Sequence, residues 1–338
     1  MPSAINIYKL LRWNKRIKSH RIKFLALYFF HRFKKRYLAV NLDPVMACNL
    51  RCKMCYFTDK DYVKTLKGQL TSDEVKRIAE VIFPRALKLQ IGCGTEPTLY
   101  KNLPEIIGLG KQYNVPYISL TTNANLLTEN SINAMLHAGL NEFTVSLHGV
   151  EKRSYEDFMG KGDYERFQDV FQIFIKLKQR FDFKVRVNYT FNEDNFLELN
   201  RLFEQFNPDS IDILQIRPIQ NLGNTAYQNF SLDKVKSVYP KVYQQLKDEC
   251  NNHGIVFMAP ERLSDLEKVN ESSIIFDYTY CYISPNKFFR KGFKWKEESF
   301  ENYTHRMGWG KQLLKNAFKS KRSLKTERNH LNYDVNFN

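Results

Sequence analysis

Between residues 36 and 251, short apolar runs with strand character alternate with amphipathic helical segments, and this alternation constrains the fold more than any other feature of the sequence. The expected strands cover 36–42, 86–91, 116–121, 142–147, 184–191 and 211–217, and the expected helices cover 70–79, 103–113, 128–139, 164–181, 196–206 and 232–251. Thr71 and Glu74 have the spacing of a capping box. Six β/α units in a row predict an α/β fold, in which right-handed crossovers curl a parallel sheet into a partial, open (β/α)6 TIM-like barrel.

The charge of the chain is concentrated at its two ends. The formal net charge is +16, and residues 1–42 contain eleven Lys and Arg but no Asp or Glu. Residues 287–338 contain thirteen basic and five acidic residues, so the body between the ends is close to neutral. We therefore expect three parts: a basic amphipathic helical extension over 1–35, the barrel over 36–254, and a C-terminal region with a basic tail over 255–338.

The sequence favours a cytoplasmic, soluble protein. The apolar run at 24–30 is seven residues long and lies between basic residues, whereas a helix that spans a bilayer needs about 20 apolar residues. Six cysteines, three of them bunched together, do not resemble the disulfide framework of a secreted domain. Peripheral contact with a membrane is compatible with both observations.

Polar residues and glycines follow each expected strand at the point where it ends. These segments are 48–55, 92–97, 121–124 and 146–149, together with polar positions within and after the last two strands. In a β/α barrel the carboxyl ends of the strands converge on one mouth, where active sites are found. The sequence therefore predicts a single functional site at this end of the barrel.

The segment Cys48-Asn-Leu-Arg-Cys52-Lys-Met-Cys55 places three thiols in one loop. Three thiolates can bind three corners of a four-iron cluster and leave one iron open for a small chelating ligand. A structural zinc site needs four protein ligands, and the fourth would have to come from a distance, from His148 or Cys93. The pattern favours the iron–sulfur cluster, and the zinc site stays open as the alternative.

The Cys48-x3-Cys52-x2-Cys55 motif after a strand, followed by Gly94-Thr-Glu-Pro97, resembles the radical S-adenosylmethionine (radical SAM) superfamily over about residues 36–220. The segments Ser146-Leu-His-Gly149 and Lys161-Gly-Asp-Tyr164 are similar to the branch that carries a cysteine-rich SPASM extension. That extension needs many more cysteines than this chain has, so residues 255–300 are interpreted as a shortened, cluster-free remnant of it.

The resemblance implies an enzyme of oxidoreductase or transferase type with one [4Fe–4S] cluster and S-adenosyl-L-methionine (SAM) as cofactors. SAM would be cleaved reductively to a 5′-deoxyadenosyl radical, which abstracts hydrogen from an unidentified peptide, protein or envelope-related small molecule. An external electron donor such as flavodoxin or ferredoxin is implied as a partner. The residues implied in SAM binding are Met54, Gly94, Thr95, Glu96, Asn123, Ser146, Arg186 and Asn188, and the cluster ligands are Cys48, Cys52 and Cys55.

Several of these residues also have a simpler interpretation. Glu96 would bind the SAM ammonium group, but it could instead cap the next helix. Asn123, Ser146 and Asn188 could be hydrogen-bonding residues of turns and strand ends. Arg186 and Arg217 could be ion-pair partners, and His148 a structural histidine. Cys93 is expected to be a small buried residue, Cys250 to be inert on the polar end of a helix, and Cys281 has no assigned role.

The basic ends have three open interpretations. The N-terminal helix could cover the barrel with its cations in solvent, contact an anionic membrane surface, or bind RNA. The uninterrupted apolar block favours the membrane over nucleic acid. The alternative to an enzyme is a non-catalytic basic protein, associated with RNA or a membrane, whose cysteines hold a structural metal.

Overall fold

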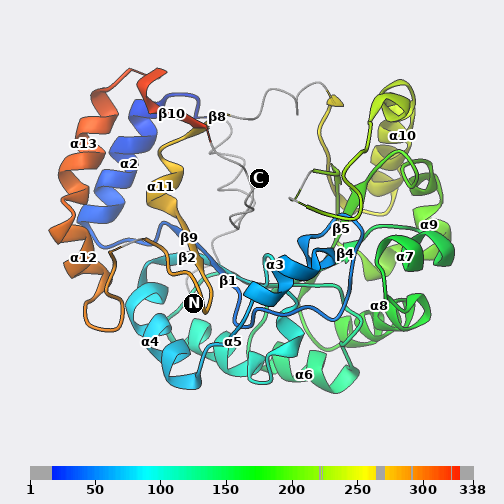
Figure 1. Ribbon diagram of the computed structural model, residues 1–338, viewed down its shortest axis with the longest axis horizontal. Helices are drawn as coiled ribbons and strands as arrows, with labels where there is room; N and C mark the ends of the chain where they lie inside the picture. The colour runs from blue at the N-terminus through cyan, green and yellow to red at the C-terminus, as the bar shows by residue number, and fades with distance from the viewer. Residues whose placement is uncertain are drawn as a thin grey trace.

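The computed structural model describes residues 17–327 except 221, 223, 264–270, 291 and 321. An eight-stranded parallel sheet with the strand order β7-β6-β5-β4-β3-β2-β1-β9 forms its centre, and helices surround it (Figure 1). The strands are β1 (Leu38–Leu42), β2 (Ala86–Ile91), β3 (Ile118–Thr122), β4 (Glu142–Leu147), β5 (Lys184–Phe191), β6 (Ile213–Pro218), β7 (Val256–Met258) and β9 (Tyr280–Ile283). A second, two-stranded antiparallel sheet pairs β8 (Glu271–Ser273) with β10 (Lys325–Glu327).

Most of the main helices lie in the predicted segments, whereas the short helices over 60–65 and 152–158 were not predicted. The main helices are α3 (Lys60–Thr65), α4 (Ser72–Ile82), α5 (Leu103–Gln112), α6 (Glu129–His137), α7 (Lys152–Phe158), α8 (Tyr164–Lys178), α9 (Leu202–Gln205) and α10 (Asp233–Asn252). The capping box of Thr71 and Glu74 is present at the start of α4, and Thr128 caps α6. Gly139 ends α6 with a φ of +103°, which favours glycine. The helix expected over 196–206 is instead a 3-10 turn followed by the single turn α9.

The sheet has two more strands than predicted, β7 and β9. Strand β9 comes from the C-terminal region. β9 pairs in parallel with β1, so that Asn41 lies opposite Tyr282 and Val40 opposite Cys281. The sequence signal was missed because this run is only four residues long and its partner lies about 240 positions earlier. Residues 280–283 therefore form the edge strand of the barrel sheet. Two strands of this sheet, β7 and β9, lie after the expected end of the barrel at residue 254.

The two basic ends meet beside this edge strand (Figure 1). Helix α2 (His20–Arg32) packs along α13 (Trp309–Phe318), next to α11 (Phe276–Thr279) and α12 (Phe300–Arg306). The ring of Phe24 is fully buried and contacts Tyr278, while His20 Nε2 lies 2.9 Å from the Lys319 carbonyl oxygen. Helix α13 of the C-terminal region ends at Phe318, and the residues of the N-terminal extension before 17 lie outside the described residues.

The two faces of the sheet differ in polarity. Side chains such as Leu42, Leu89, Val145 and Val187 point outward, are completely buried and pack on the helices. The alternate positions form the concave face, and many of them are polar: Asn41, Gln90, Thr121, Thr144, Ser146, Arg186, Asn188, Thr190, Gln215 and Arg217. A polar concave face costs free energy unless its groups have partners, which points to ligands or water on this side of the sheet.

Candidate functional site

The three motif cysteines lie in the loop that follows β1, and all are half-buried free thiols. Backbone hydrogen bonds tie this loop to the segment after α7: Arg51 donates to the Gly160 carbonyl at 2.8 Å and Lys53 to the Phe158 carbonyl at 2.9 Å. A Cβ atom at position 160 would lie 2.5 Å from the Arg51 carbonyl oxygen, so this close approach needs glycine. The segment after α7 thus fixes the cysteine loop in place.

The thiols are close enough to affect one another electrostatically. Burial raises the pKa of Cys52 well above its usual value, and negative charge on Cys55, Cys48 and Glu96 raises it further. Burial and then the Glu96 carboxylate raise the pKa of Cys48 to about 12. Thiolates are favoured here only when a positive metal centre compensates for burial.

The donor set fits an iron–sulfur cluster. Within the described part of the chain, no three His, Cys, Asp or Glu side chains surround a single metal-ion position. In a four-iron cluster, by contrast, each thiolate binds a different iron, so neighbouring thiols need not converge on one point. Three adjacent thiols from one loop meet that requirement.

Glu96 lies beside the cysteine loop and is 2% exposed. Its Oε1 accepts hydrogen bonds from the hydroxyls of Thr98 (2.6 Å) and Thr122 (2.7 Å) and from the Thr98 amide (3.2 Å). Its Oε2 accepts one from the Asn123 amide at 2.8 Å. The capping interpretation is therefore confirmed, because Glu96 caps the 3-10 turn Pro97–Leu99. Burial raises the pKa of Glu96, and these donors oppose the shift.

Two residues that the sequence analysis missed hold the turn before Glu96. Asp43, directly after β1, is completely buried and accepts hydrogen bonds from the amides of Cys93 (2.7 Å) and Gly94 (3.1 Å). Tyr282 of β9 donates its hydroxyl hydrogen to the same carboxylate at 2.7 Å. The C-terminal region thus reaches the turn 92–97 directly. The sequence signal for Asp43 was its position immediately after a strand.

The backbone of this turn requires glycine at its first position. Gly92 has a φ of +81°, and a Cβ atom there would lie 2.4 Å from the Thr121 carbonyl oxygen. The hydroxyl of Tyr56, next to Cys55, donates to the Gly94 carbonyl oxygen. Thr95 is half-buried in the same turn. The structure therefore places Gly94, Thr95 and Glu96 against the cysteine loop.

The other predicted SAM-binding residues lie in different parts of the site. Asn123 lies at the cysteine loop, since its Nδ2 donates to Asn49 Oδ1 at 2.8 Å and lies 3.9 Å from Cys48 Sγ. Ser146 and Asn188 are register partners on the concave face of β4 and β5. Met54 is buried with Phe158 and Ile219 in a small separate cluster.

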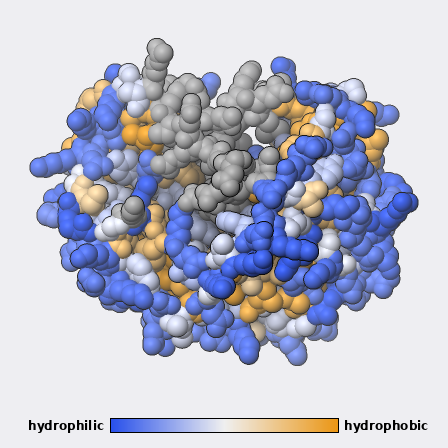
Figure 2. All heavy atoms as spheres, in the orientation of Figure 1, coloured by the Kyte–Doolittle hydropathy of each residue, from blue (hydrophilic) through white to orange (hydrophobic). Residues whose placement is uncertain are grey.

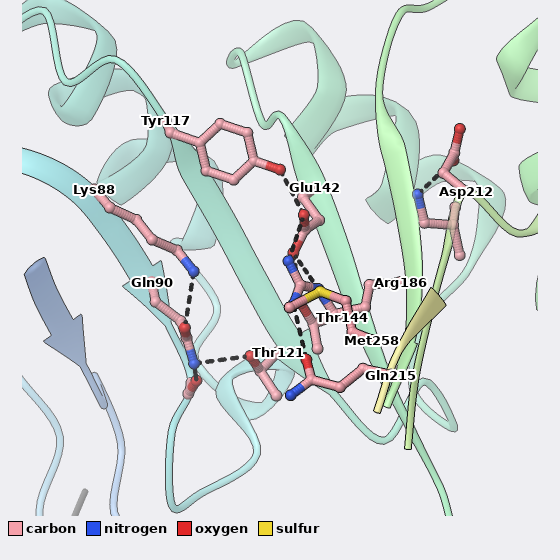
Figure 3. A network of polar contacts seen from close by, with 12 residues as sticks. Lys88, Gln90, Tyr117, Thr121, Glu142, Thr144, Arg186, Asp212, Gln215 and Met258 are labelled. Atoms are coloured by element: carbon pink, nitrogen blue, oxygen red, sulfur yellow. Dashed lines mark hydrogen bonds and ion pairs between the residues drawn. The ribbon is translucent and has the colours of Figure 1, made fainter. Parts of the chain in front are cut away.

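Arg186 has an ion-pair partner, and His148 is buried with no hydrogen-bond partner for its Nδ1 among the described residues. Arg186 forms an ion pair with Glu142, with Nε 3.0 Å from Oε1 (Figure 3). His148 is 4% exposed, and burial together with the charge of Arg217 lowers its pKa to about 3, so it is neutral. Cys250 is completely buried in α10, and Cys281 is completely buried on the outward face of β9.

The fold and the site define an α/β barrel protein with three thiols at the carboxyl end of its first strand. Residues 44–200 match the model of the Radical SAM superfamily. This part of the chain is therefore similar to radical SAM domains, whose cofactors are a [4Fe–4S] cluster and SAM.

Curated relatives match over part of their length. GTP 3′,8-cyclase of Aquifex aeolicus is 32% identical over 163 residues, which is 46% of this chain and 50% of the relative. AdoMet-dependent heme synthase of Methanosarcina barkeri is 26% identical over 207 residues, covering 59% of this chain and 54% of the relative. The matched region is thus about half the length of these proteins.

Solved structures share the fold at low sequence identity. SuiB of Streptococcus suis has a TM-score of 0.59 and 16% identity, covering 88% of this chain and 72% of that chain. The enzyme anSMEcpe, crystallised with AdoMet and the Cp18Cys peptide, has a TM-score of 0.56 and 14% identity, covering 84% of each chain. These structures support the barrel architecture. Membership of the SPASM-associated branch stays a prediction.

Proposed function

We propose that this protein is a radical SAM enzyme that acts on a substrate held against the concave face of its sheet. One observation carries the proposal: three neighbouring thiols after β1 lie beside the buried carboxylate of Glu96 after β2 and the side chain of Asn123 after β3. When bound, the cluster and SAM supply reductive cleavage of SAM and hydrogen abstraction from the substrate.

The residues of this chain have the following roles in the proposal. Cys48, Cys52 and Cys55 hold the cluster as thiolates. Oε2 of Glu96, which accepts one protein hydrogen bond, receives the SAM ammonium group. In the proposal, backbone groups of Gly94 and Thr95 lie alongside the bound SAM. The remaining candidates are polar side chains for the ribose and carboxylate of SAM (Asn123, Ser146, Asn188 and Arg186) and Met54 near the adenine. An electron donor such as flavodoxin or ferredoxin would reduce the cluster.

The test is metal analysis after anaerobic reconstitution with iron and sulfide. We expect about four irons per chain, the content of one [4Fe–4S] cluster. The other thiols are unsuited to a second cluster, since Cys250 is completely buried in α10 and Cys281 is completely buried in β9. An iron content near eight would contradict the single cluster. Colourless protein that retains zinc would support the alternative of a structural metal in a non-catalytic protein.

We also propose that α2 binds an anionic membrane surface. Ile22, Phe29 and Phe33 are 56%, 52% and 65% exposed, and they form one stripe along the helix. Hydrophobic surface appears in Figure 2 over the side of the molecule where α2 and α13 lie. Exposed cations flank the stripe, and the first 42 residues contain no acid. Apolar side chains beside cations suit a bilayer with anionic lipids. In the described part of the chain, no helix is both long and apolar enough to cross a membrane.

Vesicle sedimentation tests this contact. We expect the protein to sediment with vesicles of phosphatidylglycerol and phosphatidylcholine and to stay in solution with phosphatidylcholine alone, because the cations need anionic lipid. The double variant Phe29→Ser, Phe33→Ser should lose most of the binding. Leu197→Ser is the control, because Leu197 is 57% exposed on a different element. Equal sedimentation of the double variant and the control would contradict the proposal, as would tighter binding to RNA.

A further inference from the structure

The amino-terminal half of the concave face contains a lysine that forms no ion pair with any described carboxylate. Lys88, the third residue of β2, is deeply placed but partly accessible to solvent. Its Nζ donates to Gln90 Oε1 at 3.2 Å, and Gln90 Nε2 in turn donates to Thr121 Oγ1 at 3.2 Å (Figure 3). Among the described residues, Lys88 forms no ion pair within 4.0 Å. Burial lowers the pKa of Lys88, and the more distant Glu142 carboxylate opposes this shift.

The one carboxylate on this part of the face already has its partners. Glu142 is completely buried, and Arg186 binds it with Nε at 3.0 Å and Nη2 at 3.2 Å. The hydroxyl of Thr144 donates to it at 2.9 Å, and Tyr117 also donates to it. Burial alone would raise the pKa of Glu142, but the charge and hydrogen bonds of Arg186 hold it below its usual value. The Arg186–Glu142 pair therefore carries no net charge, and Glu142 acts on Lys88 only from beyond ion-pair distance.

A buried hydroxyl without a partner lies on the neighbouring strand, β3. Ser119 is completely buried, and its Oγ has no hydrogen-bond partner among the described residues. By register it lies between Gln90 of β2 and Glu142 of β4. Farther along the same face, Asn188 Oδ1 is also buried and unpartnered. Buried polar groups usually have partners, so these orphans mark positions where a polar ligand belongs. An ammonium group beside a hydroxyl is a donor set for an anionic oxygen.

We propose that the substrate carries an anionic oxygen group, a carboxylate or a phosphate, which Lys88 Nζ and Ser119 Oγ bind on the concave face. This inference rests on the proposed function and names the class of its substrate. Lys88 lies four residues before Gly92, about 13 Å along the strand at 3.3 Å per residue. A substrate that reaches from this subsite to the turn beside the cysteine loop is an elongated molecule with its anionic end farthest from the cysteines.

The test measures binding of small anions to reconstituted protein by isothermal titration calorimetry at fixed ionic strength. Inorganic phosphate and succinate are the two probes, and the tighter of the two identifies the group. We expect Lys88→Gln to weaken binding of that probe by about tenfold or more, because hydrogen bonds to a charged group contribute about 1.5–3 kcal/mol. Lys241→Gln, which removes an exposed cation from α10, should bind the probe as the wild type does.

Ser119→Ala provides a second variant whose fold is secure. Removing an unpartnered buried hydroxyl should leave the melting temperature unchanged or higher, while probe binding weakens several-fold. A purely structural serine would give the opposite pattern. The proposal is overturned if neither probe binds the wild type, or if Lys88→Gln and Ser119→Ala both bind within twofold of it. Iron content is measured on the same samples. A wrong cluster assignment would change the iron content, whereas a wrong anion subsite would change only the affinity for the probe.

Discussion

The Cys52→Ala variant is expected to lose the iron–sulfur cluster and all reductive cleavage of SAM while remaining folded. The loop keeps its shape through backbone hydrogen bonds, such as those from Arg51 to Gly160 and from Lys53 to Phe158, which do not involve the thiol. Two remaining thiolates leave a second iron without a protein ligand, and the cluster is not retained. Iron analysis and chromatographic detection of 5′-deoxyadenosine measure the two losses.

Cys250→Ala is the matched control for this variant. Cys250 is completely buried in α10, so its removal creates a cavity and should lower the melting temperature more than Cys52→Ala does. Its iron content and SAM cleavage should equal those of the wild type. An iron-replete Cys52→Ala protein that still forms 5′-deoxyadenosine would contradict the assignment of the cluster ligands.

Glu96→Gln is expected to weaken SAM binding by about tenfold to a hundredfold. The substitution keeps the shape of the side chain but removes the negative charge, and a charged hydrogen bond contributes about 1.5–3 kcal/mol. Iron content should be unchanged, because Glu96 is not a cluster ligand in this account. Equilibrium binding of SAM to reconstituted protein, without reductant, measures the effect.

The hydrogen bonds around Glu96 require a control that disturbs the cap alone. Thr98→Ala removes the hydroxyl that donates to Oε1 at 2.6 Å and leaves the carboxylate charge in place. We expect this variant to melt at a lower temperature and to bind SAM nearly as the wild type does. If Glu96→Gln lowers the melting temperature but leaves SAM affinity unchanged, the carboxylate is a cap only.

The sequence predicts the local elements of this fold well. The bounds of β2, β4 and β5 agree with the predicted ones, because their alternating or continuous apolar runs end at glycine or polar residues. The cysteine loop and the turn 92–97 were placed correctly for the same reason. Each of these features depends on residues that are close in sequence.

The features that the sequence analysis missed depend on contacts between distant segments. Nothing near Tyr282 indicates that it donates to Asp43, because the contact exists only after β9 pairs with β1. Lys88 is equally hidden, since a single lysine in a strand usually faces solvent. The partner of Arg186 is hidden in the same way: the sequence allows an ion pair for it, but only the pairing of β4 with β5 identifies Glu142 as the partner, and its contact with SAM stays a prediction.

Formation of 5′-deoxyadenosine tests the central claim most directly. Anaerobically reconstituted wild-type protein is incubated with SAM and dithionite, and the products are separated by liquid chromatography. We predict 5′-deoxyadenosine and methionine in equal amounts, at a level that falls to background in the Cys52→Ala variant. Protein that contains about four irons per chain but produces no 5′-deoxyadenosine would contradict the account.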